Sequence, residues 1–96
     1  MEKTRSYVAL FIVAPEKEST IDEVKNVLNS VITENAGKIQ KENMIGKKTL
    51  AYPIQKKTQG FYYEVLFDAN PESVVEMSRQ FRINTSLLRT LIDKNT

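Results

Sequence analysis

The sequence has 96 residues, the length of a single domain, and 41% of them are hydrophobic while 27% are charged. It contains no cysteine and no histidine, which excludes disulfides, thiolate catalysis, cysteine-based metal sites and the commonest general base. The formal net charge is only +2. We therefore expect one domain over residues 1–96, with no metal, nucleotide or organic cofactor and no small-molecule substrate.

The longest apolar run, residues 8–15, falls far short of the roughly 20 residues that span a bilayer. The first residues show neither the apolar core of a signal peptide nor the composition of a transit peptide. The expected location is cytoplasmic, without a membrane partner.

Charge is distributed unevenly along the chain. Residues 15–34 carry five acidic side chains against two basic ones, whereas residues 38–57 carry six basic against one acidic, and residues 79–94 carry four against one. Such a polarised domain steers a polyanion toward one face. Lysines that serve only solubility would give the same counts, so the pattern alone leaves both interpretations open.

The first half of the chain predicts a strand and a helix. Residues 5–14 are β-branched and aromatic, apolar on both faces, and end at Pro15, as in a central strand. Thr20 and Glu23 have the spacing of a capping box before an amphipathic helix over residues 20–35, and Gly37 suits its left-handed C-terminal cap.

The second half predicts three strands and a helix. Residues 39–52 form an extended stretch with a bulge at Gly46, a loop over 53–60 follows, and alternation from Phe61 marks the third strand. Asn70 caps a second helix that ends near Arg82, and residues 86–93 form the last strand. The inner stripe of this second helix is predicted to comprise Val74, Val75, Ser78 and Phe81.

The predicted order is βαββαβ. Two right-handed strand–helix–strand units place both helices on one face of a four-stranded antiparallel sheet, which is the ferredoxin-like arrangement of the α+β class. This fold hosts many functions, so the function must be argued from side chains.

The sequence contains few combinations of residues that could form an active site. Ser19 and Thr20 are explained as helix-capping residues, and no glycine-rich phosphate loop exists. Acylphosphatase shares the topology, but the segment after the first strand, residues 15–19, holds two acids and neither glycine nor arginine. A loop lined in this way repels phosphate, and we expect no enzymatic activity.

RNA recognition motifs also share the βαββαβ order and stack bases on aromatics of the first and third strands. Residues 60–63 partly follow their third-strand motif. Gln59 stands in place of its basic residue, however, and Glu64 places negative charge on the face that would meet RNA. The match is weak, and core packing explains the aromatic residues as well.

A more specific resemblance lies in the hairpin. Residues 46–54 read GKKTLAYPI and residues 56–62 read KKTQGFY. These segments resemble the signature of the bacterial small-subunit ribosomal protein S-six family. Residues 37–39 (GKI), 81–84 (FRIN) and 87–89 (LLR) continue the resemblance, which spans about residues 5–94.

The resemblance implies a structural component of the small ribosomal subunit. Such proteins bind the central domain of small-subunit ribosomal RNA as a heterodimer with small-subunit protein eighteen during assembly. Cationic side chains suit phosphates, and an aromatic ring offers a face to RNA or to the partner. The candidate RNA-binding residues are Arg5, Lys47, Lys48, Tyr52, Lys56, Lys57, Arg82 and Arg89.

Both faces of the first strand are apolar, although helices cover only one face of such a sheet. We therefore expect a protein partner on the other face, which carries either Leu10 and Ile12 or Tyr7 and Phe11. The remaining alternative is a ferredoxin-like regulatory or dimerisation module that binds a small ligand or its own copy through the sheet. Such a module needs no basic hairpin.

Overall fold

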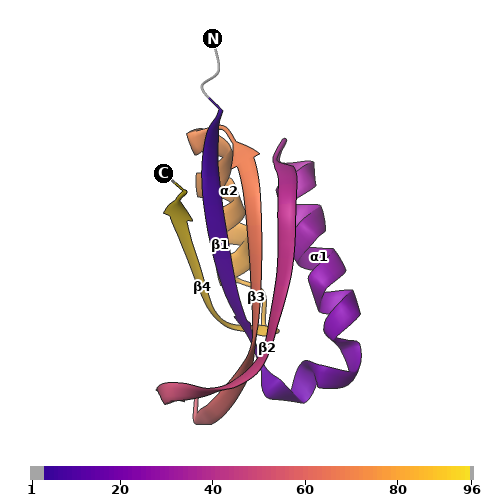
Figure 1. The fold of residues 1–96 in the computed structure, drawn as a ribbon, viewed down its shortest axis with the longest axis vertical. Coiled ribbons are helices and arrows are strands. Elements are labelled where there is room, and N and C mark those ends of the chain that lie inside the picture. Colours follow the sequence, from indigo (N-terminus) through magenta and orange to yellow (C-terminus); the bar gives the residue numbers. More distant parts are fainter. Residues whose placement is uncertain (1–3, 96) are drawn as a thin grey trace.

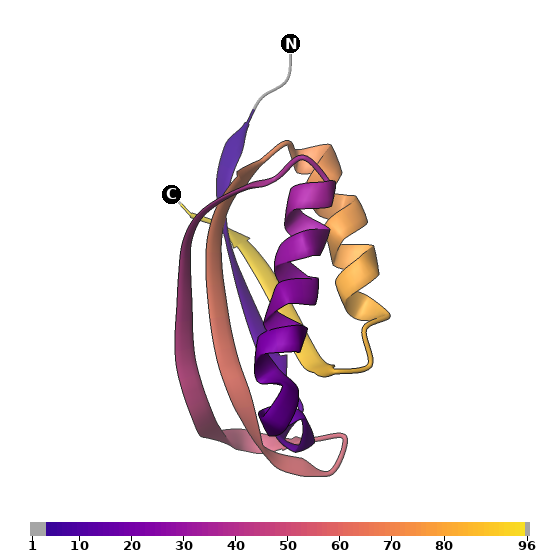
Figure 2. The same ribbon diagram turned by 90° about the vertical axis from the view of Figure 1, so that its right-hand side faces the viewer.

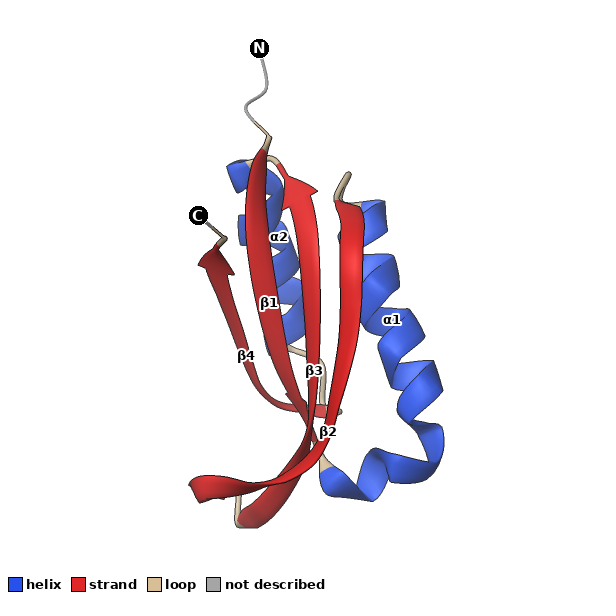
Figure 3. Cartoon of the chain, in the orientation of Figure 1, coloured by secondary structure: helices blue, strands red, loops and turns tan. Residues whose placement is uncertain are grey.

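The computed structural model describes residues 4–95, and its centre is a four-stranded antiparallel sheet (Figures 1 and 3). The strands stand in the order β2-β3-β1-β4. Their bounds are β1 Arg5–Val13, β2 Lys38–Ile54, β3 Lys57–Ala69 and β4 Leu87–Lys94. The predicted ferredoxin-like fold is confirmed.

Two helices, α1 (Ile21–Glu34) and α2 (Pro71–Arg82), lie side by side on one face of the sheet and leave the other face open (Figure 2). The short 3-10 helix η1 (Pro15–Thr20) joins β1 to α1. No helix among residues 4–95 is long and apolar enough to cross a membrane.

The core lies between the sheet and the helices. β1 contributes Tyr7, Ala9, Phe11 and Val13 to it. The ring of Phe11 meets Phe81 of α2 edge to face, with 4.7 Å between centroids, and stacks on Tyr63 of β3. Aromatic contacts of this kind add to the free energy gained by burial. The central strand therefore anchors both layers, which agrees with its predicted position.

The start of α1 differs from the prediction. Thr20 occupies the N-cap, but its side chain makes no capping hydrogen bond and instead donates to the carbonyl of Lys17 within η1. The expected capping box with Glu23 is therefore wrong. The 3-10 turn places Thr20 at the end of its own helical segment, so its hydroxyl turns back into that segment.

The end of α1 also differs. The left-handed residue is Ala36, with φ of 63°, and not Gly37. Gly37 is needed for another reason, because a Cβ there would lie 2.6 Å from Cγ2 of Ile32 and 2.7 Å from its carbonyl oxygen. The amide of Gly37 donates to that same carbonyl at 2.8 Å, which closes the helix end.

Strand β2 follows the prediction at Gly46. Its φ of 110° is a conformation that side chains rarely adopt, and the pairing with β3 shifts there. The loop expected over 53–60 is wrong. Both strands continue almost to the tip of the hairpin, and only Gln55 and Lys56, each with positive φ, form the turn (Figure 3).

Helix α2 begins as expected, because the side chain of Asn70 accepts a hydrogen bond from the amide of Glu72. Its buried stripe is partly wrong. Met77 and Phe81 are buried, whereas Val75 is 72% exposed. The helix meets the sheet along a line through residues 77 and 81, which turns position 75 outward.

Candidate nucleic-acid interface

Most of the predicted cationic residues gather at one end of the molecule. Phe61 of β3 pairs with both Val13 of β1 and Lys47 of β2, and Val13 pairs with Leu87 at the start of β4, so these positions lie at one level of the sheet. Beyond this level the β2–β3 hairpin curls across the lower end of the sheet (Figure 1). We call this region the hairpin end, and it contains Lys47, Lys48, Tyr52, Lys56, Lys57, Arg82 and Arg89.

Unequal strand lengths produce the curl. Between the pairs Thr49–Gln59 and Ile54–Lys57, β2 has four residues while β3 has only Thr58. Extra residues on one strand bend and twist a ladder. Within this segment Leu50 is buried, and Tyr52 is 55% exposed. The bend brings the turn of the hairpin toward β4 and α2.

Tyr52 and Arg89 join the hairpin to β4. Nη1 of Arg89 donates to the hydroxyl of Tyr52 at 2.7 Å, and its guanidinium lies 5.5 Å from the centroid of the ring. A guanidinium has five N–H donors, so most remain for another acceptor. The predicted RNA-binding tyrosine thus orients a predicted RNA-binding arginine.

A hollow of about 310 Å³ lies where three elements converge. Gln55 from the hairpin turn, Arg82 from the end of α2 and Arg89 from β4 all line it. The sequence indicated these two arginines as separate candidates. The structure places them on one concavity, and Gln55 joins them only because the hairpin curls.

Two hairpin lysines are already paired with carboxylates of η1. Nζ of Lys57 lies 3.3 Å from Glu16, and Nζ of Lys47 lies 3.7 Å from Glu18. A backbone hydrogen bond, with a further contribution from Lys57, lowers the pKa of Glu16 below its usual value. The sequence placed the acids and the lysines in separate segments, and their proximity arises only when the hairpin end folds beside η1.

Lys48 and Lys56 form no salt bridge with any residue in the range 4–95, and both are exposed. Lys48 pairs with Gly60 on the ladder, and Lys56 lies in the turn at the tip. An exposed ammonium group on a flexible stem is suited to a phosphate as a point charge. Of the four hairpin lysines, these two can therefore bind a polyanion without first breaking an ion pair.

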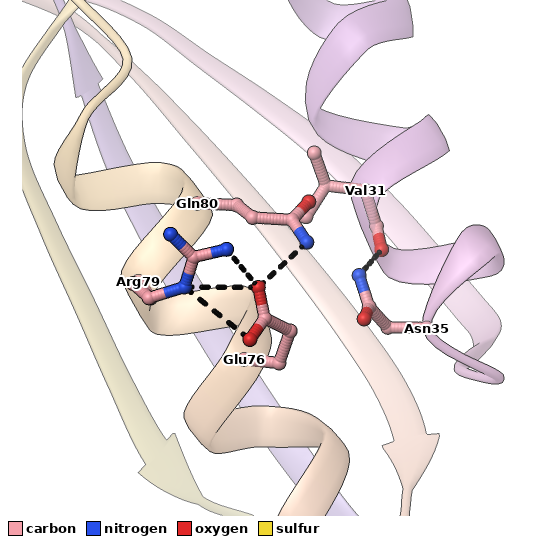
Figure 4. A network of polar contacts seen from close by, with 5 residues as sticks. All are labelled: Val31, Asn35, Glu76, Arg79 and Gln80. Carbon is pink, nitrogen blue, oxygen red and sulfur yellow. Dashed lines mark hydrogen bonds and ion pairs between the residues drawn. The ribbon is translucent and has the colours of Figure 1, made fainter.

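Arg79 lies one turn before Arg82 but is engaged differently. Its guanidinium donates to both carboxylate oxygens of Glu76, and Gln80 donates to the same carboxylate (Figure 4). The hydrogen bonds from Arg79 lower the pKa of Glu76, and the carboxylate in turn raises the pKa of Arg79. Arg79 does not line the hollow.

Arg5 lies away from the hairpin end. It pairs with Ala69 at the opposite end of β1, eight positions from Val13. At about 3.3 Å per residue this separation is roughly 26 Å. The structure therefore does not bring Arg5 together with the other candidate RNA-binding residues.

The register decides which face of β1 is open. Tyr7 is 6% exposed and Phe11 is fully buried, and both point into the core beneath the helices. The expectation that these two meet a partner is corrected, because α1 and α2 already cover them. Leu10 and Ile12 face the open side, as the alternation along a strand requires, but Ile12 is only 6% exposed, so of the two only Leu10 offers surface there.

The open face carries a group of apolar side chains. Leu10 pairs with Leu91 of β4, which is 49% exposed, and Ile12 pairs with Tyr62 of β3. Glu64 interrupts the group on β3. We call this group the open-face patch, and it comprises Val8, Leu10, Ile12, Tyr62, Leu66 and Leu91.

A polar network closes the helix side of the sheet near β2. The hydroxyl of Tyr63 lies 2.8 Å from Oε1 of Glu42 and 2.9 Å from the side chain of Asn29 on α1. The hydrogen bond from Tyr63 is the main reason that the pKa of Glu42 is lowered, and burial raises the pKa of Tyr63. The network holds α1 against β2.

A ferredoxin-like domain with a cationic end and an apolar open face has the features of a binding or structural protein. Comparison with known proteins agrees: the family model described as Ribosomal protein S6 matches residues 6–94. The chain therefore belongs to the ribosomal protein S6 family.

Curated relatives support this assignment. The chain is 38% identical over 92 residues to the small ribosomal subunit protein bS6 of Shouchella clausii, covering 95% of this chain and 97% of that protein. It is 37% identical over 91 residues to the bS6 protein of Pseudarthrobacter chlorophenolicus, covering 94% and 90%. The chain is thus a structural constituent of the small subunit of the cytoplasmic ribosome, and it is not an enzyme.

Solved structures agree with the fold. The crystal structure of 30S ribosomal protein S6 from Thermotoga maritima superposes with a TM-score of 0.90 at 26% identity, covering 97% of this chain and 89% of that one. The C-terminal domain of the MgtC protein from Mycobacterium tuberculosis reaches a TM-score of 0.67 at 9% identity, which shows a shared fold alone.

Proposed function

We propose that this protein binds the central domain of small-subunit ribosomal RNA through its hairpin end, together with small-subunit protein eighteen on its open face, during subunit assembly. The observation that carries the proposal is the continuity of the two surfaces. Leu91 of the open-face patch lies two residues along β4 from Arg89 of the hairpin end, on the same side of the strand. A protein on the patch and an RNA at the hairpin end would therefore be neighbours.

The hairpin end supplies the RNA contacts. Four lysines and two arginines from β2, the hairpin turn, β3, α2 and β4 present positive charge from several elements, which suits the curved backbone of a folded RNA. The Arg5 side chain, at the far end of β1, is proposed as a separate contact outside this cluster.

The open-face patch supplies the protein contact. Apolar side chains on a sheet face without helices favour a partner that removes them from water, at about 25 cal/mol for each Å² of apolar surface. Within the patch, Leu10 and its exposed neighbour Leu91 are the proposed contacts, while Ile12 is already buried and offers little surface.

The test is a filter-binding titration of the central-domain RNA fragment, with and without purified protein eighteen. We expect tight binding only when both proteins are present. Absence of binding in both titrations, with the domain shown to be folded by circular dichroism, would contradict the proposal.

A pair of variants assigns the RNA contacts. Lys48→Ala combined with Lys56→Ala should weaken binding and reduce the log–log salt slope by roughly 0.7–0.9 for each lost phosphate contact. Lys38→Ala combined with Lys41→Ala removes the same charge from the other end of β2 and serves as the control. Equal losses from the two pairs would show that only net charge matters.

A further inference from the structure

The hollow at the hairpin end is built from parts of the chain that are far apart in sequence. Its lining comes from the turn between β2 and β3, the last two turns of α2, and β4. Figure 2 shows the tip of the hairpin reaching beneath the layer of helices. Its volume of about 310 Å³ is at the lower end of the range for small-molecule sites.

Two kinds of side chain line the hollow. Arg82 and Arg89 are exposed and line it, and guanidinium groups bind phosphate in a bidentate manner or stack on a base. Its apolar wall comprises Phe81, Leu87, Leu88 and Ile92, of which Leu88 and Ile92 are the partly exposed ones. A phosphate alone needs only the guanidinium groups, whereas the flat face of a base packs against apolar side chains.

Hydrogen-bonding side chains complete the lining. Gln55 offers an amide, while Ser78 and Thr90 offer hydroxyl groups, all of which both donate and accept. The edge of a nucleobase also carries donors and acceptors. Proteins read single-stranded RNA by holding unstacked bases against apolar or planar groups and by hydrogen bonding to their edges. The lining has each of these components.

The geometry points to a binding site for one unpaired nucleotide of ribosomal RNA, with its phosphate between Arg82 and Arg89 and its base against the apolar wall. This inference rests on the proposed RNA-binding function and deepens it. Arg89 is held in place by Tyr52, so one side of the site is ordered before RNA arrives.

The first test is a nuclear magnetic resonance titration of the isolated domain with a single-stranded RNA trinucleotide, up to millimolar concentration. We expect saturable shifts of the backbone amides of Ser78, Leu88 and Thr90, and no shifts at the Glu42 network on the opposite edge. A trinucleotide that lacks its central base should give clearly smaller shifts. The absence of shifts at the hollow, or equal shifts from both oligonucleotides, would overturn the proposal.

Two pairs of variants test separately the space within the hollow and the positive charge of its arginines. Ser78→Leu keeps both arginines and fills the space, so it should weaken trinucleotide binding at least fivefold, whereas Ser30→Leu on the exposed surface of α1 should leave it unchanged. Arg82→Gln should weaken it similarly, with Arg79→Gln one turn earlier as the matched control. Equal effects within either pair would contradict a built site.

The same variants distinguish this proposal from the proposed function. If Ser78→Leu leaves binding of the central-domain RNA with protein eighteen unchanged, and the trinucleotide gives no shifts, the nucleotide site is wrong while the ribosomal RNA interface stands. If the unmodified protein fails to bind the central-domain RNA with its partner, the proposed function itself is wrong.

Discussion

Tyr52 accepts a hydrogen bond of 2.7 Å from Nη1 of Arg89, and its ring lies 5.5 Å from the same guanidinium. The two residues are 37 positions apart, one on the bulged part of β2 and the other on β4. The contact spans the hairpin end and ties its curl to the far edge of the sheet. An arginine held in this way loses less conformational freedom when it binds RNA.

Replacing Tyr52 by phenylalanine tests this preorganisation. The ring remains, but Arg89 loses its acceptor, so we expect RNA affinity to fall by about 2- to 10-fold, equivalent to roughly 0.5–1.5 kcal/mol for one immobilised side chain. Because the pair is exposed, the free energy of unfolding should fall by less than about 1 kcal/mol. Titration with central-domain RNA and protein eighteen, with chemical denaturation alongside, measures both effects.

Tyr62→Phe is the control for that variant. Tyr62 also lies on the open side of the sheet, and its hydroxyl makes no hydrogen bond with the rest of residues 4–95. The ring that belongs to the open-face patch stays in this variant, so removing the hydroxyl alone should leave RNA affinity nearly unchanged. An equal loss from both variants would show that the hydroxyl of Tyr52 acts directly on RNA or on the partner and not through Arg89.

The carboxylates of η1 should compete with RNA for the hairpin lysines. Glu16 and Glu18 hold Lys57 and Lys47 at 3.3 and 3.7 Å, and phosphate binding requires these ion pairs to separate. Glu16→Gln combined with Glu18→Gln should therefore raise RNA affinity about 3- to 10-fold at low salt, with a smaller gain at high salt because the charges are exposed. Filter binding across a salt series measures this.

Net charge alone would also raise affinity, so a matched pair is needed. Asp22→Asn combined with Glu23→Gln removes the same two charges from the first turn of α1, where neither residue forms a salt bridge within residues 4–95. We expect a clearly smaller gain from this control. Gains of equal size would mean that the ion pairs of η1 do not restrain the lysines.

The sequence predicts the strands, helices and fold because their signals are local. The alternation of β3 and the cap at Asn70 depend on neighbours in the chain, and both appear in the structure. The hairpin end is a different case. Pro53 and the polar run after it indicate a loop, yet the strands continue, because Pro53 lies in the unpaired bulge, where its missing amide costs no ladder bond, and Ile54 pairs again with Lys57.

The candidate site was predictable only as a set of residue types. The motif in the hairpin indicates lysines and Tyr52, but the pairing of Lys57 with Glu16 depends on how η1 lies beside the hairpin, which no local pattern encodes. The register of β1 likewise needs the structure, since both of its faces are apolar. The helices decide it by covering Tyr7 and Phe11.

The network of Glu42 should make stability depend on pH in the acid range. The hydrogen bond from Tyr63 lowers the pKa of Glu42 in the folded state, so the ionised carboxylate stabilises that state. This contribution is fully present above pH 4.5 and is lost as the pH falls through the folded pKa. Glu42→Gln should therefore destabilise the protein at pH 7 and have less effect near pH 3.

Urea denaturation at several pH values measures this difference. The control is Glu34→Gln, an exposed carboxylate at the end of α1 that forms no salt bridge within the described residues. It should show a smaller and flatter difference across the same range. If Glu42→Gln and the native protein differed by the same amount at pH 3 and pH 7, the ionised form of Glu42 would not be what the network stabilises.

The open-face patch should bind the partner protein through Leu91 and its neighbour Leu10. Leu91 is 49% exposed, so Leu91→Ser removes apolar surface from the patch while leaving the core intact. We expect the affinity for protein eighteen to fall at least fivefold, equivalent to about 1 kcal/mol, as for a truncated interface residue. Isothermal titration calorimetry of the two purified proteins measures the change.

Val75→Ser is the matched control, because Val75 is 72% exposed on α2, on the side of the sheet away from the patch. It also removes one exposed apolar side chain, so any general effect on solubility or folding should be shared by the two variants. Partner affinity should be unchanged in this control. If Val75→Ser weakened the complex and Leu91→Ser did not, protein eighteen would bind the helices, and the open face would need another occupant.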